Sequence, residues 1–446
     1  MSIYILGISA FYHDSASCLL KDGELIAAAQ EERFSRIKHD SSFPISAINF
    51  CLEKASVEFA DISAVAFYDD PVLTFDRIVN SSVTNFPQSE DHFLESASSF
   101  LKLKPNLEKL INDYFKITKP TFYCRHHFSH AASAFYPSPF KDAAIICVDG
   151  VGEWNTTSIS HGYNTSIKSC HEINFPHSLG LLYSAFTYYC GFKVNSGEYK
   201  LMGLAPYGEP SYVAKLKDHI IDIKEDGSFC LNMEYFDYQK SNFLINDSFC
   251  SLLGGAPRKP ESKITIKELN LANSIQKVTE EVMLKLSHFA KKEIGSSNLC
   301  LAGGVALNCV ANGKILSEGL FDNIWIQPAS GDAGGCIGAA YLTYLNYYNG
   351  RLSKIKGEDL QSGSLLGPSY SNPEITNFLN DKDAKYQIEM DDDLMASKIA
   401  ISEMCFIPDK MFFKIIFIGF RSSMIIDSSY IRFLSFIKNY INKEKR

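Results

Sequence analysis

The sequence predicts an α/β protein built from two related lobes around a shared cleft. Twice in the chain, an apolar strand feeds a tight turn that presents His or Asp, and a second strand returns from it. The two stretches read GISAFYHDSAS and CVDGVGEWNTTS. At 446 residues the chain also exceeds the size at which one hydrophobic core stops growing, so two or three domains are expected.

Three strands are expected near the N-terminus, in the stretches IYILGIS, CLL and ELIAAAQEERF. The last two flank Asp22-Gly23, a typical hairpin turn, so they are expected to pair antiparallel. A helix is expected to begin near Pro44 in FPISAINFCLEKA, because Pro favours the first turn and apolar residues recur at helical spacing. The run AVAFYDD then predicts a further strand.

The second half contains the strongest helix signal of the chain, an amphipathic pattern over 265–295 that closes at Gly295. LCLAGGVALNC follows as a strand, a Gly-Gly turn and a helix start at Asn308. IWIQPASGDAGGCIGAAYLTYL repeats this plan and carries Asp332 between glycines before another helix. The preceding segment, about 209–263, is irregular and polar, which indicates an insertion.

The composition is that of a globular soluble protein, with 46% apolar and 21% charged residues. A net charge of −8 offers no general attraction to nucleic acid or to an anionic membrane, so neither is an expected partner. The Ile/Phe-rich tail is interrupted by Lys414 and Arg421 and is too short to span a membrane. Twelve cysteines occur singly and the N-terminus lacks a basic signal segment, so reduced thiols in the cytoplasm are expected.

The stretch HHFSH places His126 and His130 one helical turn apart on the same face. Two imidazoles at this spacing can share one divalent ion, with Asp149 and Asp332 from glycine-flanked turns as the carboxylates that complete the site. Such a set suits iron, zinc or manganese better than magnesium or calcium, because imidazole is a borderline ligand. The alternative is that these histidines cap a helix or form hydrogen bonds in the core.

His13 lies in the first turn beside Asp14, and its ordinary pKa suits a general base for a hydroxyl nucleophile. The alternative is a turn histidine bonded to Asp14. Lys38 could neutralise a phosphate or could belong to a solvated charged face. A Gly-Gly turn before a helix start allows close approach of a phosphate, but alone it is a weak nucleotide signal.

Seven motifs of this chain occur in the order found in one known enzyme family. They are GISAFYHDSAS, AAAQEERFSRIKHD, HHFSHAASAFYPSPF, VDGVGEW, GEYKLMGLAPYG, LAGGVALNC and SGDAGG. From about residue 2 to residue 345 the chain resembles the O-carbamoyltransferases of nodulation-factor and antibiotic biosynthesis. The resemblance implies an actin/hexokinase-like fold of duplicated lobes, similar to the universal tRNA threonylcarbamoyl-transferring protein.

The resemblance also implies a reaction. In the family, a C-terminal domain resembling the threonylcarbamoyl-AMP synthase makes carbamoyl-adenylate from carbamoyl phosphate and ATP. The N-terminal domain passes the carbamoyl group to a hydroxyl of a small-molecule natural product or sugar. Matched motif by motif, the metal ligands fall on His126, His130, Asp149 and Asp332, the catalytic base on His13, and nucleotide or acyl-adenylate contacts on Lys38, Gly303, Gly304 and Asn308. The ion is expected to be iron, with zinc or manganese as alternatives.

The expected domains follow from the same resemblance: 1–350 for carbamoyl transfer, with lobes of about 1–140 and 141–350, then a linker over 351–368, and the start of the adenylate-forming domain over 369–446. The family's second domain should continue with a Gly-rich, Arg-bearing stretch, but this sequence diverges after about residue 401. We therefore expect a transfer domain that depends on a separate activation domain or protein.

Other functions compete with carbamoyl transfer. A catalytically incomplete remnant that still binds metal and nucleotide is the main alternative, because the Arg-bearing segment is missing. A tRNA-modifying enzyme is disfavoured by the net negative charge of the chain and by the specific sequence HHFSHAASAFYPSPF. A metalloprotease is disfavoured because the histidine pair lacks the glutamate of an HExxH motif. No motif identifies the acceptor, whose contacts are expected in the regions 70–120 and 209–263.

Overall fold

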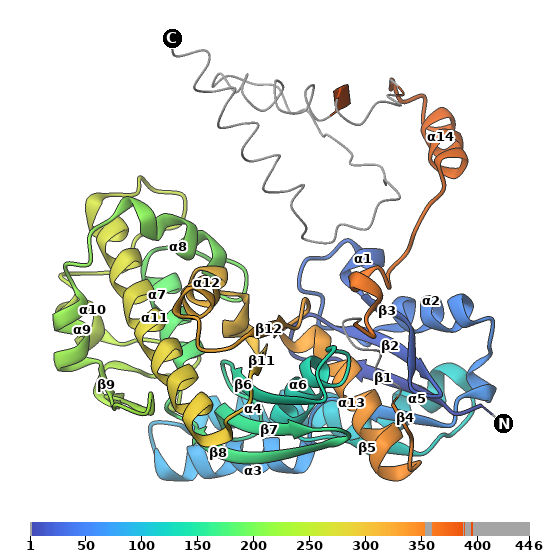
Figure 1. Cartoon of the computed structure of the whole chain (residues 1–446). Coiled ribbons are helices and arrows are strands. Elements are labelled where there is room, and N and C mark those ends of the chain that lie inside the picture. Colours follow the sequence, from blue (N-terminus) through green and yellow to red (C-terminus); the bar gives the residue numbers. More distant parts are fainter. Residues whose placement is uncertain (1, 353–358, 387, 389–393, 396–446) are drawn as a thin grey trace. The chain divides into compact units, whose positions relative to one another are not determined.

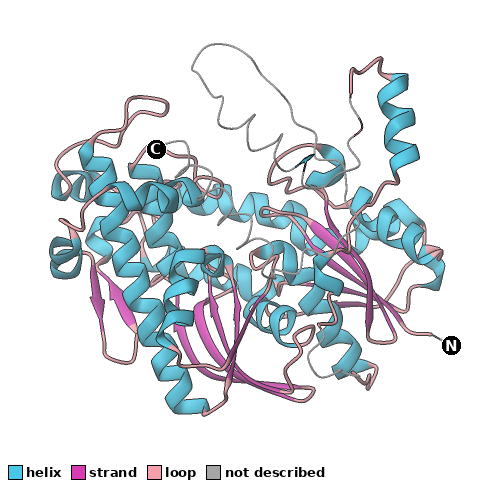
Figure 2. Cartoon of the chain, turned by 45° about the horizontal axis from the view of Figure 1, so that its top comes forward, coloured by secondary structure: helices cyan, strands magenta, loops and turns pink. Residues whose placement is uncertain are grey.

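The computed structural model describes residues 2–352, 359–386, 388 and 394–395 (Figure 1). The chain divides into two compact units, 1–366 and 367–446. The first unit contains two five-stranded sheets with helices packed on them (Figure 2). The predicted divergence after residue 401 lies outside the described residues.

The first sheet has the strand order β3-β2-β1-β4-β5. β1 pairs antiparallel with β2 and parallel with β4. The hairpin predicted at Asp22-Gly23 joins β2 to β3, and both residues have positive φ, as a tight hairpin turn requires. The strands are β1 (Tyr4–Ser9), β2 (Ala16–Lys21), β3 (Glu24–Gln30), β4 (Ala64–Phe67) and β5 (Thr121–Tyr123).

The second sheet repeats this topology with the order β12-β11-β6-β7-β8. β6 pairs antiparallel with β7 and parallel with β11, as β1 does with β2 and β4. The predicted α/β fold with duplicated lobes is therefore confirmed. The strands are β6 (Asp142–Val148), β7 (Asn155–Tyr163), β8 (Ser166–Asn174), β11 (Asn298–Ala302) and β12 (Asn323–Ile326).

The structure confirms the helix predicted near Pro44 as α2 (Ile45–Ala55) and corrects the sequence prediction at two points. The stretch QEERF is not all strand, because β3 ends at Gln30 and a short helix follows. Pro44 lies at the N-cap, one position before the first helical turn in which it was expected. The helices are α1 (Glu32–Ser35), α2 (Ile45–Ala55), α3 (Pro71–Thr84), α4 (Glu90–Leu103) and α5 (Leu107–Phe115).

Two helices, α6 (His126–Phe135) and α13 (Asp332–Tyr347), cross in close contact and share one hydrophobic core with the first sheet. Gly338 makes the crossing tight, because a Cβ there would overlap the carbonyl oxygen of Ser129. Gly7 of β1 lies equally close to the backbone of Cys336. A helix that belongs to the second half of the sequence thus covers the first sheet, while the predicted domain limits stay a prediction.

The second lobe has its own core beneath the long helix α11. The predicted pattern over 265–295 is confirmed, since α11 begins after a capping box at Thr265 and ends at Gly295, which has positive φ. The predicted insertion contributes α9, β9, β10 and α10 to this core. The elements are α7 (Leu179–Tyr189), α8 (Glu198–Leu204), α9 (Val213–His219), β9 (Ile221–Ile223), β10 (Phe229–Leu231), α10 (Asp247–Leu252), α11 (Ile266–Ile294) and α12 (Cys309–Glu318).

Part of the predicted linker belongs to the first unit. Leu366 is buried in the core of the first sheet and its carbonyl accepts from the Ala28 amide, while the Gln361 amide donates to Gln327. In the second unit, α14 (Asn372–Asp381) begins with a capping box formed by Ser371 and Glu374. None of the helices in the described ranges is both long and apolar enough to cross a bilayer.

Candidate metal centre

Four buried side chains converge at the junction of α6, β6 and α13. The Nε2 atoms of His126 and His130 lie 3.0 Å apart, and Asp149 Oδ2 lies 2.9 Å from the first and 3.2 Å from the second. Asp332 Oδ1 lies 3.6 Å and 3.7 Å from the same two nitrogens. One atom of each side chain falls within 4.8 Å of all the others. The structure therefore brings together all four residues for which metal binding was predicted.

Each of these side chains is held at the end of an element. His126 and His130 occupy the first two turns of α6, and Asp332 is the first residue of α13. Asp149 directly follows β6, and its second oxygen accepts from the Gly304 amide at 3.0 Å. Because one Asp149 oxygen is fixed by the backbone, the other is directed at the histidines.

The charges of the cluster are strongly coupled. Burial would raise the pKa of Asp149, but hydrogen bonds from His126 and His130 hold it well below its usual range. Burial would lower the pKa of His130, but Asp149 and Asp332 raise it to about 9. The raised pKa of His130 shows that these carboxylates favour a positive charge at this point.

The donor set of this cluster fits a divalent cation. Two imidazole nitrogens and two carboxylate oxygens, all buried, converge on one point. Nitrogen and oxygen donors of this kind suit iron, zinc or manganese. The identity of the ion stays a prediction.

Glu153, a residue that the sequence reasoning did not single out, anchors the histidine helix. Its side chain is buried, with 3% of the residue exposed, and Oε1 accepts from the backbone N–H of His126 at 2.7 Å and of Asp70 at 2.9 Å. Burial and the nearby Asp69 raise the pKa of Glu153. A carboxylate in the glycine-containing turn VDGVGEW was the only sequence signal that pointed to it.

Replacing Glu153 with alanine is expected to destabilise the protein by about 2 kcal/mol, because the buried N–H of His126 and the partly buried N–H of Asp70 lose their acceptor. Urea unfolding of the purified variants measures this. Glu153→Gln is the matched control, since its carbonyl oxygen can still accept, and it should retain most of the stability. Equal losses in the two variants would contradict the anchoring role.

His13 lies at the edge of the cluster. Its Nε2 is 3.8 Å from Asp332 Oδ2, and its Nδ1 is 2.8 Å from Asp14 Oδ2. The His13 ring thus makes contacts that agree with both interpretations. One nitrogen is bonded to Asp14, as in a turn histidine, and the other faces a candidate metal ligand, as a general base at the site would. Burial would lower the pKa of His13, but the carboxylates of Asp332 and Asp14 raise it to about 9.

The glycines and the asparagine predicted to contact nucleotide make close contacts and hydrogen bonds with other residues of the protein. Gly303 has φ +85 and lies against the backbone of Val148, where a Cβ would overlap the carbonyl oxygen. Gly304 donates its amide to Asp149. Asn308 caps α12 by accepting from the Ala311 amide and exchanges two hydrogen bonds with Gln276. Their part in binding adenylate stays a prediction.

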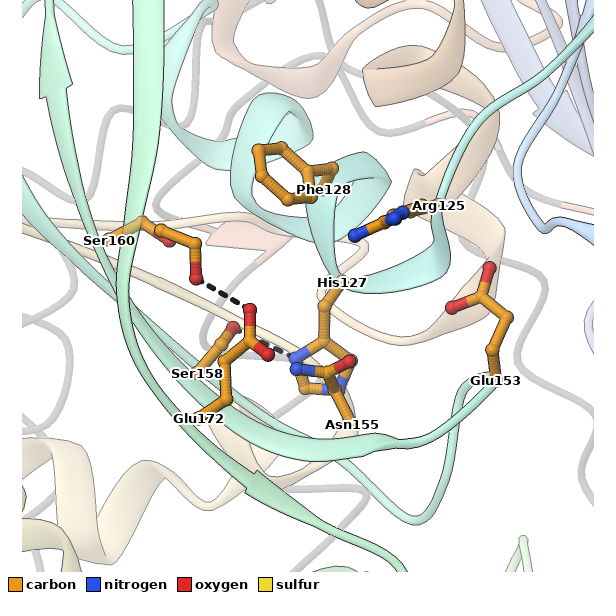
Figure 3. Close-up of a pocket in the computed structure, with 9 residues that line it drawn as sticks. Arg125, His127, Phe128, Glu153, Asn155, Ser158, Ser160 and Glu172 are labelled. Carbon is orange, nitrogen blue, oxygen red and sulfur yellow. Dashed lines mark hydrogen bonds between the residues drawn. The ribbon is translucent and has the colours of Figure 1, made fainter. Parts of the chain in front are cut away.

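Two further residues lie apart from the four ligands. Lys38 is exposed, and its Nζ lies 5.2 Å from the ring centroid of Tyr199 on α8, so it reaches from the first lobe to the second. His127 does not belong to the group of four candidate ligands, and its Nδ1 lies 2.9 Å from Ser158 Oγ in a small polar pocket (Figure 3). Burial and the neighbouring His126 and His130 lower the pKa of His127 to about 3.

Comparison with known proteins places this chain. The family described as "Carbamoyltransferase N-terminus" matches residues 4–341. The chain belongs to this carbamoyltransferase family. The matched range contains both sheets and all four residues of the candidate metal centre.

Relatives of this carbamoyltransferase chain include proteins of bacteria. An uncharacterized protein of Synechocystis is 50% identical over 402 residues, which cover 88% of this chain and 65% of that protein. Nodulation protein NolNO of Sinorhizobium fredii is 32% identical over 334 residues, which cover 75% of this chain and 46% of that protein. The chain thus spans about half to two thirds of the length of these relatives.

Among solved structures, component A of the (R)-2-hydroxyglutaryl-CoA dehydratase of Acidaminococcus fermentans is similar with a TM-score of 0.41 and 15% identity. The similarity covers 77% of this chain and 98% of that chain.

Proposed function

We propose that this chain transfers a carbamoyl group from carbamoyl-adenylate to a hydroxyl of a small-molecule natural product or sugar. The observation that carries the proposal is the convergence of His126, His130, Asp149 and Asp332 beside His13, in a chain of the carbamoyltransferase family. The donor, the acceptor class and the roles of the residues are all parts of the proposal.

In this reaction the acceptor oxygen attacks the carbamoyl carbon. A carbon–oxygen bond forms, the bond from that carbon to the phosphate oxygen of the adenylate breaks, and AMP leaves with the bonding electron pair. His13 Nε2 takes the hydroxyl proton as general base, which suits its place at the edge of the cluster. AMP is a good leaving group and needs no additional acid.

The four ligands set the charge around His13. A bound divalent ion would supply positive charge for the adenylate phosphate and would offset the carboxylates that raise the pKa of His13 to about 9. Asp332 takes part in both effects, because it faces His13 as well as the two histidines of α6. A general base must be neutral to accept a proton, so this offset would favour the proposed role of His13.

The first helix of the region 70–120 reaches the site. Asp70, which caps α3, donates its backbone N–H to Glu153, so the start of α3 is fixed to the loop after β6. Trp154 donates its indole N–H to Asp76 of the same helix. These contacts support the proposal that α3 contributes to acceptor binding.

An assay with two donors tests the proposed function. The purified chain is given a panel of hydroxylated acceptors with carbamoyl phosphate plus ATP in one arm and preformed carbamoyl-adenylate in the other. We expect product from the adenylate alone. His13→Gln should lower that rate by about 100-fold or more, because general base catalysis typically contributes this much.

The remaining outcomes distinguish the alternatives. Product from carbamoyl phosphate plus ATP would show that the chain activates the donor itself, which contradicts the dependence on a separate activation protein. Product in neither arm, with ion and nucleotide bound in calorimetry, would favour the incomplete remnant over the transferase.

A further inference from the structure

A chain of three side chains leads away from the candidate metal centre through His13. Asp14 bridges two histidines, with Oδ2 at 2.8 Å from His13 Nδ1 and Oδ1 at 2.7 Å from His39 Nδ1. All three residues are partly buried. The His13 ring therefore has one nitrogen on Asp14 and the other facing Asp332.

The backbone around this chain is held in an unusual conformation. Asp14 has φ 55 and His39 has φ 58, and these backbone angles lie in the left-handed region, which residues other than glycine adopt infrequently. Two hydrogen bonds fix the loop of His13 to the loop of His39, from the Phe11 amide to Ser41 and from the Ser15 amide to Asp40. Residues held in such conformations cluster at functional sites.

His39 is itself anchored on both sides. Its backbone N–H donates to Glu32 Oε2 at 2.9 Å, which ties it to α1. The residue before it is Lys38, whose ammonium lies over Tyr199 of the second lobe. The loop that supports Asp14 is thus connected to both lobes.

We propose that Asp14 and His39 are positioning residues that hold His13 with its Nδ1 protonated and its Nε2 lone pair directed at the acceptor hydroxyl. The inference rests on the proposed function of His13 as the general base. A carboxylate that accepts from one imidazole N–H fixes which nitrogen carries the proton and how the ring is oriented. His39 donates to the other oxygen of Asp14 and so fixes the carboxylate.

Kinetics of the chain of residues 1–446 with preformed carbamoyl-adenylate provide the first test. Asp14→Ala is expected to lower kcat by about 100-fold, the size of the general base contribution, with the KM of the acceptor and the bound ion unchanged. His39→Ala should lower kcat by about 10-fold, whereas His39→Asn should retain activity because its amide nitrogen takes the place of Nδ1 and can still donate to Asp14. Unchanged kcat in Asp14→Ala would overturn the proposal.

A spectroscopic measurement keeps the proposal testable without catalysis. Imidazole ¹⁵N shifts of histidine-labelled, zinc-loaded protein report the proton position, and His13→Gln identifies the His13 signals by their loss. We expect a protonated Nδ1 and a bare Nε2 in the wild type, and loss of this single form in Asp14→Ala. The same single form in both proteins would refute the positioning role. Absence of transfer by the wild type, with the spectra as expected, would refute only the proposed function.

Discussion

Replacing His130 with alanine is expected to abolish binding of the divalent ion and transfer from carbamoyl-adenylate. The ring is fully enclosed, and its Nε2 lies within 3.0–3.2 Å of His126 and Asp149. Its loss removes one of two nitrogen donors and leaves Asp149 with fewer partners. Because breaking a buried ion pair is strongly destabilising, the metal-free variant should also lose about 3 kcal/mol of stability. Metal analysis and chemical unfolding measure the two effects.

His127→Ala is the matched control for this prediction. His127 is also a buried histidine on the same helix, but its Nδ1 lies 2.9 Å from Ser158 Oγ and it does not belong to the group of four candidate ligands. The control should bind the ion with the wild-type stoichiometry, whatever it loses in stability. Loss of the ion from His127→Ala but not from His130→Ala would show that the ligand set is misassigned.

The second large effect is expected for Gly338→Ala. A methyl group at this position would overlap the Ser129 carbonyl oxygen, so α6 and α13 would have to separate. Overpacking of a tight core contact typically costs about 1–3 kcal/mol, and a backbone collision lies at the upper end of that range. Because the two helices carry three of the four candidate ligands, ion affinity should fall along with the melting temperature.

Gly313→Ala separates this collision from the general effect of a helical glycine. Gly313 lies within α12, and a Cβ there meets nothing within 4 Å. The control should be stabilised by about 1 kcal/mol, because alanine has the higher helix propensity. Thermal unfolding of both variants with and without zinc makes the comparison, and equal behaviour would contradict a role for the helix crossing.

The fold was predictable where the signals were local. Apolar strands, the Asp22-Gly23 turn and the capped pattern that ends at Gly295 each depend on residues a few positions apart, and the structure confirms them. The pairing of β1 with β4 and of β6 with β11 depends on segments far apart in the sequence. That arrangement could be expected only from the repetition of the two openings and from the resemblance to a family.

In the candidate site, too, local features could be predicted from the sequence and long-range contacts could not. The i, i+4 spacing places His126 and His130 on one helix face, and this follows from helix geometry alone, whereas their assignment to a metal ion depended on the resemblance to a family. The anchoring of His126 by Glu153 and the bridge from Asp14 to His39 were not predicted, because tertiary folding alone brings these partners together. Gly304 and Asn308 were expected near nucleotide, and their main contacts are with Asp149 and Gln276.

The crossing of α13 over the first sheet also bears on the order of folding. Cys18 in β2 donates to the carbonyl of Cys336, a partner 318 positions later, and both residues belong to one core. Contacts of such separation form slowly, because a long loop must close before burial repays its entropy. During synthesis, the apolar face of β1 and β2 therefore stays uncovered until nearly all of residues 1–347 have been made. Asp332, the last candidate ligand in the sequence, is the first residue of α13, the helix that covers this face. Completion of the metal centre and closure of the first core are thus one event.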